Sequence, residues 1–288
     1  MNKWMIGLLV AGLVSCNTKN GTNETNIPNN QLSMPEEKNE IVSQPVIDID
    51  TFTVNGVSFT MVYVEGDRFD MGATPEMLEA YENEKPAHEA LLGDYWIGRT
   101  EVTQALWQAV MEDNPSKTKG KTLPVDKVSW DDVRQFISKL NALTGEEFRL
   151  PSEAEWEFAA RGGKLSKHYS YSGSNNPEDV AWFDCGEPHP VSSKQPNELG
   201  IYDMSGNVWE WCNDWYDEKY YETLYLSSNL GDMVNPKGPE EGTHCVLRGG
   251  SWGGGAQYCR CSCRAGYQPQ FSDIDCGFRL ASSRRKKP

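Results

Sequence analysis

The sequence predicts a loop-rich domain of the α+β class. Residues with the two-residue period of strands open the folded part, and about three helices with clear capping signals occupy its middle. Short apolar pieces separated by Gly, Asn, Pro and Ser follow to the end of the chain. Helices in the middle and short strands at both ends fit this class better than alternating βαβ units, and no internal repeat is present.

The first part of the domain is expected to be a β-hairpin. Between Thr51 and Met71, apolar residues alternate with polar residues and glycine, as they do in a half-buried sheet. The alternating apolar positions are Phe52, Val54, Val57, Phe59, Met61 and Tyr63.

Three helices are predicted from their own start and stop signals. Each begins after a residue whose hydroxyl oxygen can accept a hydrogen bond from the first turn, and the second and third add an acidic residue three places on. These signals are Thr103 before 104–111, Ser129 with Asp132, and Ser152 with Glu155. Asn114-Pro115, Gly145 and Gly162-Gly163 are expected to end the three helices in turn.

No further helix is expected after Gly163. A chain with so little regular hydrogen bonding needs other sources of stability, and the candidates are buried tryptophans, disulfides and bound cations. The closely spaced Glu153, Glu155 and Glu157 are interpreted as structural, because acidic residues near a helix N-terminus interact favourably with the helix dipole.

The charge balance argues against nucleic acid as a partner. The 288 residues carry 27 Lys and Arg against 42 Asp and Glu, a formal net charge of −15 that repels polyphosphate. The only basic cluster lies in the tail 284–288, which is expected to be a solvated end without a role.

The first residues resemble the signal peptide of a bacterial lipoprotein. An apolar run from Trp4 to Val14, too short to span a bilayer, precedes Ser15 and Cys16, and the segment 1–16 is therefore expected to end in a lipobox at which Cys16 is acylated. Residues 17–45 are rich in Asn, Thr, Glu and Pro and predict a flexible tether, which leaves 46–283 as the domain. The expected location is the cell envelope. With Asn17 after the lipidated residue, the outer membrane is favoured.

Four strings together resemble the formylglycine-generating enzyme, or sulfatase-modifying factor, family. They are RLPSEAEWEFAARGG at 149–163, GIYDMSGNVWEW at 200–211, LRGGSW at 247–252 and CGFRLA at 276–281. The resemblance covers roughly residues 55 to 283. It implies a C-type-lectin-like fold with long loops and structural calcium.

By similarity to one calcium site of that family, four residues are expected to bind Ca²⁺. Asp203 and Glu210 would supply side-chain oxygens, and Gly206 and Val208 would supply backbone carbonyls, a mixture that suits calcium. In the alternative interpretation, Glu210 pairs with a neighbouring basic residue while the adjacent tryptophans pack in the core.

The resemblance also locates the catalytic positions of the family and shows a departure from them. Enzymes of this family place one cysteine two residues after the tryptophan of GGSW and another five residues later, and the two thiolates bind copper(I). Here the second position is Cys259, but the first is Gly254, which has no side chain. Copper is therefore not expected. Ser251 occupies a further family position, where it either makes a turn hydrogen bond or lines the ancestral pocket.

Seven cysteines remain after Cys16, and disulfides in an oxidising compartment are the favoured interpretation. Seven is an odd number, so at least one thiol stays unpaired, and Cys259 is the expected one. Cys259, Cys261 and Cys263 would share one face if the segment were an extended strand, too far apart for two sulfurs to hold one linear metal.

Three functions remain open. The favoured hypothesis is a lipid-anchored module that binds or assembles a protein or glycan partner in the envelope without oxidase activity, as lipoproteins of this family do in gliding-motility and type IX secretion machinery. The second is an oxidoreductase that converts a cysteine of an exported sulfatase to formylglycine. The third is a lectin-fold receptor whose 253–275 loops, with Tyr267 and Phe271, recognise a glycan or a protein.

Overall fold

The computed structural model describes residues 47–227 and 230–284. The signal peptide, Cys16, the tether up to residue 45 and nearly all of the basic tail lie outside these residues, so the interpretations made for them remain predictions. Within the described part of the chain, no helix has the length and apolarity needed to cross a bilayer.

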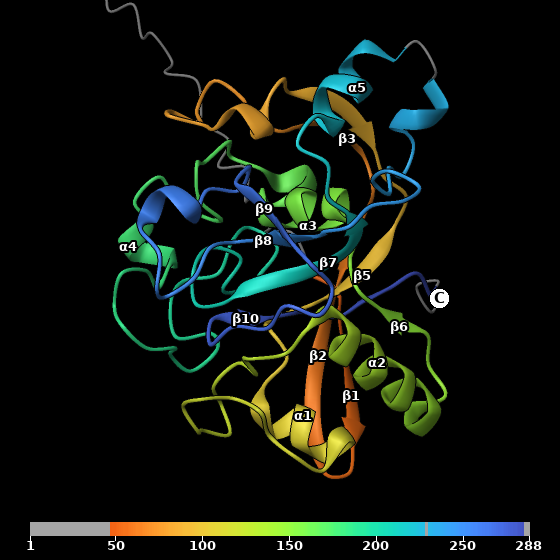
Figure 1. Ribbon diagram of the computed structural model, residues 1–288, viewed down its shortest axis with the longest axis vertical. Coiled ribbons are helices and arrows are strands. Elements are labelled where there is room, and N and C mark those ends of the chain that lie inside the picture. Colours follow the sequence, from red (N-terminus) through yellow and green to blue (C-terminus); the bar gives the residue numbers. More distant parts are fainter. Residues whose placement is uncertain (1–46, 228–229, 285–288) are drawn as a thin grey trace, which may run out of the picture. The chain divides into compact units, whose positions relative to one another are not determined.

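Two main sheets form the framework (Figure 1). The five-stranded sheet is antiparallel and has the order β1 (Ile49–Val54), β2 (Val57–Val64), β5 (Tyr95–Gly98), β11 (Ala281–Ser282) and β6 (Phe148–Arg149). The four-stranded sheet has the order β10 (Cys276–Gly277), β7 (Trp209–Trp215), β8 (Cys245–Arg248) and β9 (Arg264–Tyr267). A separate pair joins β3 (Arg68–Met71) to β4 (His88–Leu91). The predicted hairpin is thus confirmed as β1 and β2.

The three predicted helices are confirmed, together with their caps. They are α1 (Gln104–Met111), α2 (Trp130–Thr144) and α3 (Glu153–Ala160). Thr103 accepts a hydrogen bond from the backbone of Leu106, and Ser129 and Ser152 both form complete capping boxes. Gly145 adopts the left-handed conformation at the end of α2, where a side chain would be strained.

The prediction that no helix follows Gly163 is wrong. The structure adds the short α4 (Pro177–Val180), the longer α5 (Tyr220–Leu226) and 3₁₀ turns at Gly163–Leu165, Leu230–Met233 and Ala256–Tyr258, besides an earlier one at Glu82–Glu84. No side chain caps the N-terminus of α5, so the usual start signal is missing. The helix is stabilised instead by tertiary burial of Tyr221 and Leu224, three residues apart on one face.

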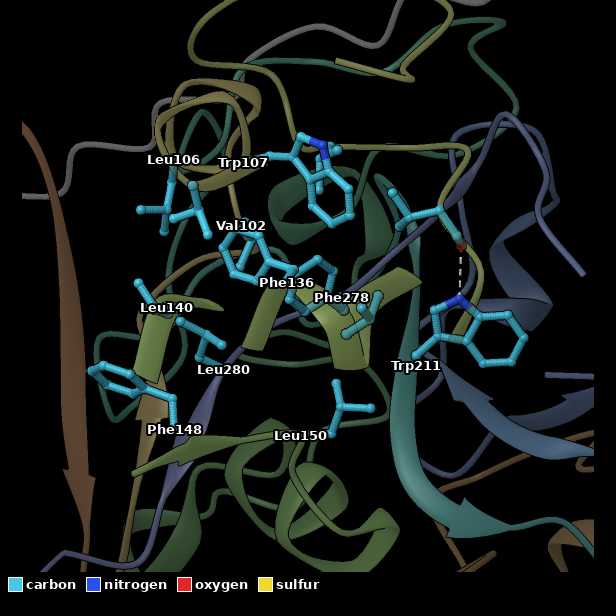
Figure 2. Packing of buried hydrophobic residues seen from close by; sticks show 14 of the residues in the cluster. Val102, Leu106, Trp107, Phe136, Leu140, Phe148, Leu150, Trp211, Phe278 and Leu280 are labelled. Atoms are coloured by element: carbon cyan, nitrogen blue, oxygen red, sulfur yellow. Dashed lines mark hydrogen bonds between the residues drawn. The ribbon is translucent and has the colours of Figure 1, made fainter. Parts of the chain in front are cut away.

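An aromatic core packs α1 and α2 against the strands (Figure 2). The rings of Trp107 and Phe136 stack with centroids 5.1 Å apart, and Phe278 contacts both of them edge-on. On the neighbouring sheet, the indole N–H of Trp211 donates to the carbonyl of Val128 at 3.0 Å, which satisfies the one polar group of this buried ring.

A buried ion network lies beneath α3 and explains its acidic residues. Arg248 donates to Glu153 at 2.8 Å and to Glu157 at 2.6 Å, and Arg264 binds both oxygens of Glu153 at 2.7 Å. All four side chains are almost completely buried. The structural interpretation is therefore confirmed for Glu153 and Glu157, whose partners are arginines distant in sequence rather than the helix dipole alone. Glu155 also has a structural role, because it completes the capping box with Ser152 and pairs with Arg149.

Candidate binding pocket and buried carboxylate pair

A glycine turn after β8 leads directly into a segment that lines the candidate pocket. Gly249 and Gly250 both have positive φ, of 95° and 72°. A Cβ at Gly250 would lie 2.9 Å from the sulfur of Cys259 and 2.8 Å from the backbone of Tyr258, so only glycine fits between them. The turn directs Ser251 toward the loop before β10, where its hydroxyl donates to Asp275 Oδ2 at 2.6 Å.

The cavity next to this turn has a volume of about 380 Å³, within the range of small-ligand sites. We call it the Tyr258 pocket. Its lining residues come from four separate segments of the chain and are Tyr81, Asn83, Trp209, Ser251, Gly253, Gly254, Tyr258, Cys263, Arg264, Ala265, Tyr267 and Asp275. Two positions singled out by the sequence, Ser251 and Gly254, are therefore brought together here, and Tyr267 joins them.

The Tyr258 ring lies against the position where the family carries its first cysteine. A Cβ added to Gly254 would be 3.1 Å from Cδ2 of this ring, which is a tight contact. The ring of Tyr81 stacks on Tyr258 with centroids 6.1 Å apart, and the ring of Trp209 is tilted against it at 6.4 Å. The glycine that removes a metal ligand thus makes room for an aromatic wall.

Cys259 does not line this pocket, and its segment is not the extended strand in which Cys259, Cys261 and Cys263 would share one face. Cys259 is buried behind Gly250, and residues 259–263 form bends and turns that precede β9. Cys263, rather than Cys259, contributes to the pocket wall. Burial raises the pKa of both thiols to about 12, so both are protonated at neutral pH.

The favoured disulfide interpretation is not borne out, because all seven cysteines of the described part of the chain are free. Cys185 alone among them is exposed. Its backbone N–H donates to the carbonyl of Trp252 at 3.0 Å, and the N–H of Asp184 donates to that of Gly254 at 2.8 Å. The 184–185 loop therefore fixes the backbone of the pocket turn.

The four residues expected to bind calcium lie in one segment, 203–210, but Glu210 is already fully engaged. Its two oxygens accept hydrogen bonds of 2.6 Å from Nε and Nη2 of Arg279, and Oε2 also accepts one of 2.7 Å from the indole of Trp156. All three side chains are completely buried. These are the contacts of the alternative interpretation, in which Glu210 pairs with a basic residue.

A second carboxylate approaches Asp203 from β5's side of the structure. Glu101 lies three residues after the end of β5. Its side chain is 2% exposed, and that of Asp203 is 3% exposed. Asp203 Oδ2 accepts the backbone N–H of Ser192 at 2.6 Å, and Glu101 Oε2 accepts Asn207 Nδ2 at 3.1 Å. Neither Asp203 Oδ1 nor Glu101 Oε1 has a hydrogen-bond partner.

Burial is the largest cause of a raised pKa in both groups. It raises the pKa of Asp203 to about 6 and that of Glu101 well above its usual value, and the nearby charge of Asp203 raises the pKa of Glu101 further. The segment around Asp203 is irregular, with positive φ at Asp203, Gly206 and Asn207. Backbone of this kind is typical of calcium sites. No three His, Cys, Asp or Glu side chains converge as a metal site anywhere in residues 47–227 and 230–284.

Sequence reasoning missed Glu101, Tyr81, Cys263 and Asp275. Glu101 stands in the sequence IGRTEVT at 97–103, and nothing in its spacing indicates proximity to Asp203, about a hundred residues away. Asp275 directly precedes the CGFRLA string, and only the parallel pairing of β10 with β7 places it beside the GGSW turn.

Comparison with known proteins agrees with the fold and the motifs. Residues 48–284 match the family described as the sulfatase-modifying factor enzyme 1-like domain. The chain is 31% identical over 308 residues to the chaperone protein LppX of Paenibacillus barcinonensis, with 88% of this chain and 89% of that protein covered. It is 34% identical over 206 residues to the formylglycine-generating enzyme of Thermomonospora curvata, with 65% of this chain and 64% of the enzyme covered.

A solved structure shares the fold over most of the domain. Treponema denticola variable protein 1 superposes with a TM-score of 0.71 and 32% identity, covering 81% of this chain and 98% of that one. The α+β class, the loop-rich architecture and the four sequence strings all agree with this family assignment. This chain belongs to the sulfatase-modifying factor family, whose members include the formylglycine-generating enzymes.

Proposed function

We propose that this protein is a partner-binding member of the sulfatase-modifying factor family that has lost copper oxidase chemistry. The observation that carries the proposal is the exchange at Gly254, where a sulfur ligand is absent and the ring of Tyr258 takes the adjacent space. The residues present do not fit copper(I): Cys259 is buried behind Gly250, and the remaining pocket thiol, Cys263, stays protonated at neutral pH because burial raises its pKa to about 12.

A protein partner is favoured over a glycan. The relative LppX, which is covered over 89% of its length, is named a chaperone protein, and a chaperone acts on other proteins. The Tyr258 pocket adds a physical reason, because three of its rings are between 37% and 46% exposed. Exposed tyrosines gathered around one cavity are typical of protein-binding surfaces.

We further propose that the domain is held at the cell envelope through acylated Cys16, and that the outer membrane is its location. The support is the short apolar run, the lipobox-like sequence before Cys16 and the polar segment 17–45 that would serve as a tether. Metabolic labelling with a palmitate analogue tests the anchor: wild-type protein should be labelled, and the Cys16→Ser variant should not.

Calcium is proposed as a structural cation, with a changed ligand set. Glu101 and Asp203 would supply carboxylate oxygens, and the carbonyls of Gly206 and Val208 would complete the site. With both acids ionised, the cluster of Glu101, Asp203, Glu210 and Arg279 carries a net charge of −2, which a divalent cation would neutralise. Since both carboxylate oxygens of Glu210 accept hydrogen bonds from Arg279, we assign the second carboxylate ligand of calcium to Glu101.

The oxidase part of the proposal is tested on the purified full-length chain under reducing conditions. We expect no tight one-to-one copper(I) binding in competition with a chelator and no aldehyde formation on a sulfatase-derived cysteine peptide. Tight binding together with peptide oxidation would establish the enzyme alternative instead.

The partner part is tested by site-specific photocrosslinking in the native host. A benzoylphenylalanine at Tyr267, in the pocket wall, is expected to give a discrete crosslinked protein. The same residue at Leu143, which is 54% exposed on α2 and outside the pocket, serves as the matched control and should give none. A position 267 that yields no adduct, or the same adducts as position 143, would contradict a binding role for this pocket.

A further inference from the structure

The Tyr258 pocket combines several aromatic rings with one carboxylate, that of Asp275, among its lining residues. Tyr81, Tyr258 and Trp209 pack against one another, and Tyr267 stacks on Phe271 with centroids 4.3 Å apart. The carboxylate of Asp275 lies among these lining residues. Aromatic faces carry negative electrostatic potential, so the rings and the carboxylate act in the same direction on a bound group.

The charge of Asp275 is not neutralised by the protein. Its Oδ2 accepts the Ser251 hydroxyl, and its Oδ1 contacts only the weakly donating thiol of Cys276 at 3.8 Å, within the described residues. A neutral hydroxyl and a thiol orient the carboxylate without cancelling its charge. Ser251 thus acts as a positioning residue that holds one oxygen of the carboxylate.

Arg264, which lines the pocket, and Arg260, which contacts the pocket ring of Tyr81, are both committed to other acids. Arg264 lines the cavity, but it binds both oxygens of Glu153 at 2.7 Å. Arg260 lies over the ring of Tyr81 with Cζ 5.4 Å from its centroid, and it forms a buried ion pair with Glu84. Arg260 also shows that one face of the Tyr81 ring already accepts a guanidinium group.

The pocket is better suited to a cation than to a sugar. Its uncommitted charged group is a hydrogen-bond acceptor, whereas its serine and arginine donors are already used within the protein. A lysine or arginine side chain brings only donors, together with a positive charge that the rings attract. The net charge of −15 also favours the approach of a basic partner.

We propose that the Tyr258 pocket binds the ammonium or guanidinium group of a lysine or arginine side chain on the partner protein, with Asp275 as its counter-ion and Tyr258, Tyr81 and Tyr267 as its aromatic cage. This rests on the partner-binding function proposed above and names the chemistry recognised there. The absence of a side chain at Gly254 is what allows the Tyr258 wall of the cage.

The experiment titrates blocked tripeptides Gly-Lys-Gly, Gly-Arg-Gly and Gly-norleucine-Gly into the full-length chain, with binding followed by ligand-observed NMR. We expect the basic peptides to bind in the millimolar range and the norleucine peptide, which has the same apolar stem without the charge, to bind at least about tenfold more weakly. Equal binding of all three would overturn the proposal. n-Butylammonium, which is the lysine side chain without its backbone, is run in parallel and should bind about as tightly as the lysine peptide. Absence of n-butylammonium binding would overturn recognition of the ammonium group.

Variants locate the site. Asp275→Asn keeps an oxygen that can accept the Ser251 hydroxyl, and it should weaken binding of the lysine peptide about tenfold. Tyr267→Ala removes an exposed ring and should weaken binding of the same peptide several-fold. Glu241→Gln makes the same charge change at an exposed position outside the pocket and should leave binding unchanged. If Glu241→Gln lost as much affinity for the lysine peptide as Asp275→Asn does, the loss would come from the net charge of the protein. That result would overturn the assignment of the binding site to this pocket.

The outcome is separable from the partner-binding proposal. If photocrosslinking at Tyr267 gives a discrete adduct while the basic peptides show no preference over norleucine, the partner function stands and the cation assignment fails. If neither experiment succeeds, both proposals fail.

Discussion

Replacing Glu210 and Glu101 separately by glutamine distinguishes an ion-pair residue from a cation ligand. The two carboxylates belong to the same buried cluster and the substitutions are isosteric, so each variant serves as the control for the other. In Glu210→Gln the fully buried Arg279 loses its ionised partner and two charge-assisted hydrogen bonds of 2.6 Å. Breaking a buried pair from one side costs about 3–5 kcal/mol of unfolding free energy, a large part of a typical domain's stability.

Glu101→Gln is expected to behave in the opposite way. Glu101 Oε1 has no hydrogen-bond partner, and burial holds the pKa of this carboxyl well above its usual value, so the neutral glutamine replaces a group whose charged form the site already disfavours. In EDTA the variant should be as stable as wild type or more stable. Its stabilisation by calcium should disappear, because one of the two proposed carboxylate ligands is gone.

The assay is urea unfolding followed by tryptophan fluorescence, in EDTA and in about 10 mM calcium. With a dissociation constant of about 10⁻⁴ M, typical of weak extracytoplasmic sites, calcium should stabilise wild type and Glu210→Gln by about 2–3 kcal/mol. The reasoning is refuted if Glu101→Gln keeps this calcium effect, or if Glu210→Gln loses it while unfolding at the wild-type urea concentration in EDTA.

Three further outcomes are expected. Gly254→Cys alone should leave copper(I) affinity weak in chelator competition, because Cys259 remains buried behind Gly250 with its pKa raised to about 12; a sharp gain would show that the two sulfurs can meet. Burial raises the pKa of Asp126 to about 6, so the stability that its protonated form contributes is full below about pH 4 and is lost as pH rises through 6. The unfolding free energy of Asp126→Asn should therefore rise by about 1–2 kcal/mol relative to wild type between pH 4 and pH 7. A difference in urea midpoint that stays constant with pH would contradict this. Trp107→Ala removes a ring stacked on Phe136 and should cost about 3–5 kcal/mol by urea unfolding, with a loss below 1 kcal/mol inconsistent with the packing described.

Local structure could be predicted from the sequence because its causes are local. The caps at Thr103, Ser129 and Ser152 each act within three residues of the helix start, and all three are observed. Helix α5 could not be predicted in this way, because its N-terminus lacks a capping side chain and its stability comes from burying Tyr221 against distant parts of the chain.

The site was predictable only where the motif strings contain it. Ser251 was identified within the LRGGSW string and Gly254 by its position two residues after it, and both line one cavity. The partners that decide the chemistry of the site come from far along the chain: Arg279 reaches Glu210 across 69 residues, and Asp275 reaches Ser251 across 24. Side-chain spacing in one sequence carries no information about such contacts, so Glu210 was interpreted by similarity and Glu101 was missed.

The position of β11 has a consequence for how the protein is made. This two-residue strand lies near the end of the chain, yet it is inserted between β5 and β6, and Arg279 just before it donates to the carbonyls of Gly98 and Tyr202. The five-stranded sheet therefore cannot close until residues 279–282 have left the ribosome, or the translocon if the chain is exported. Until that moment the edges of β5 and β6 are open to other extended chains, and a chaperone that binds unfolded chains would be most useful during this interval.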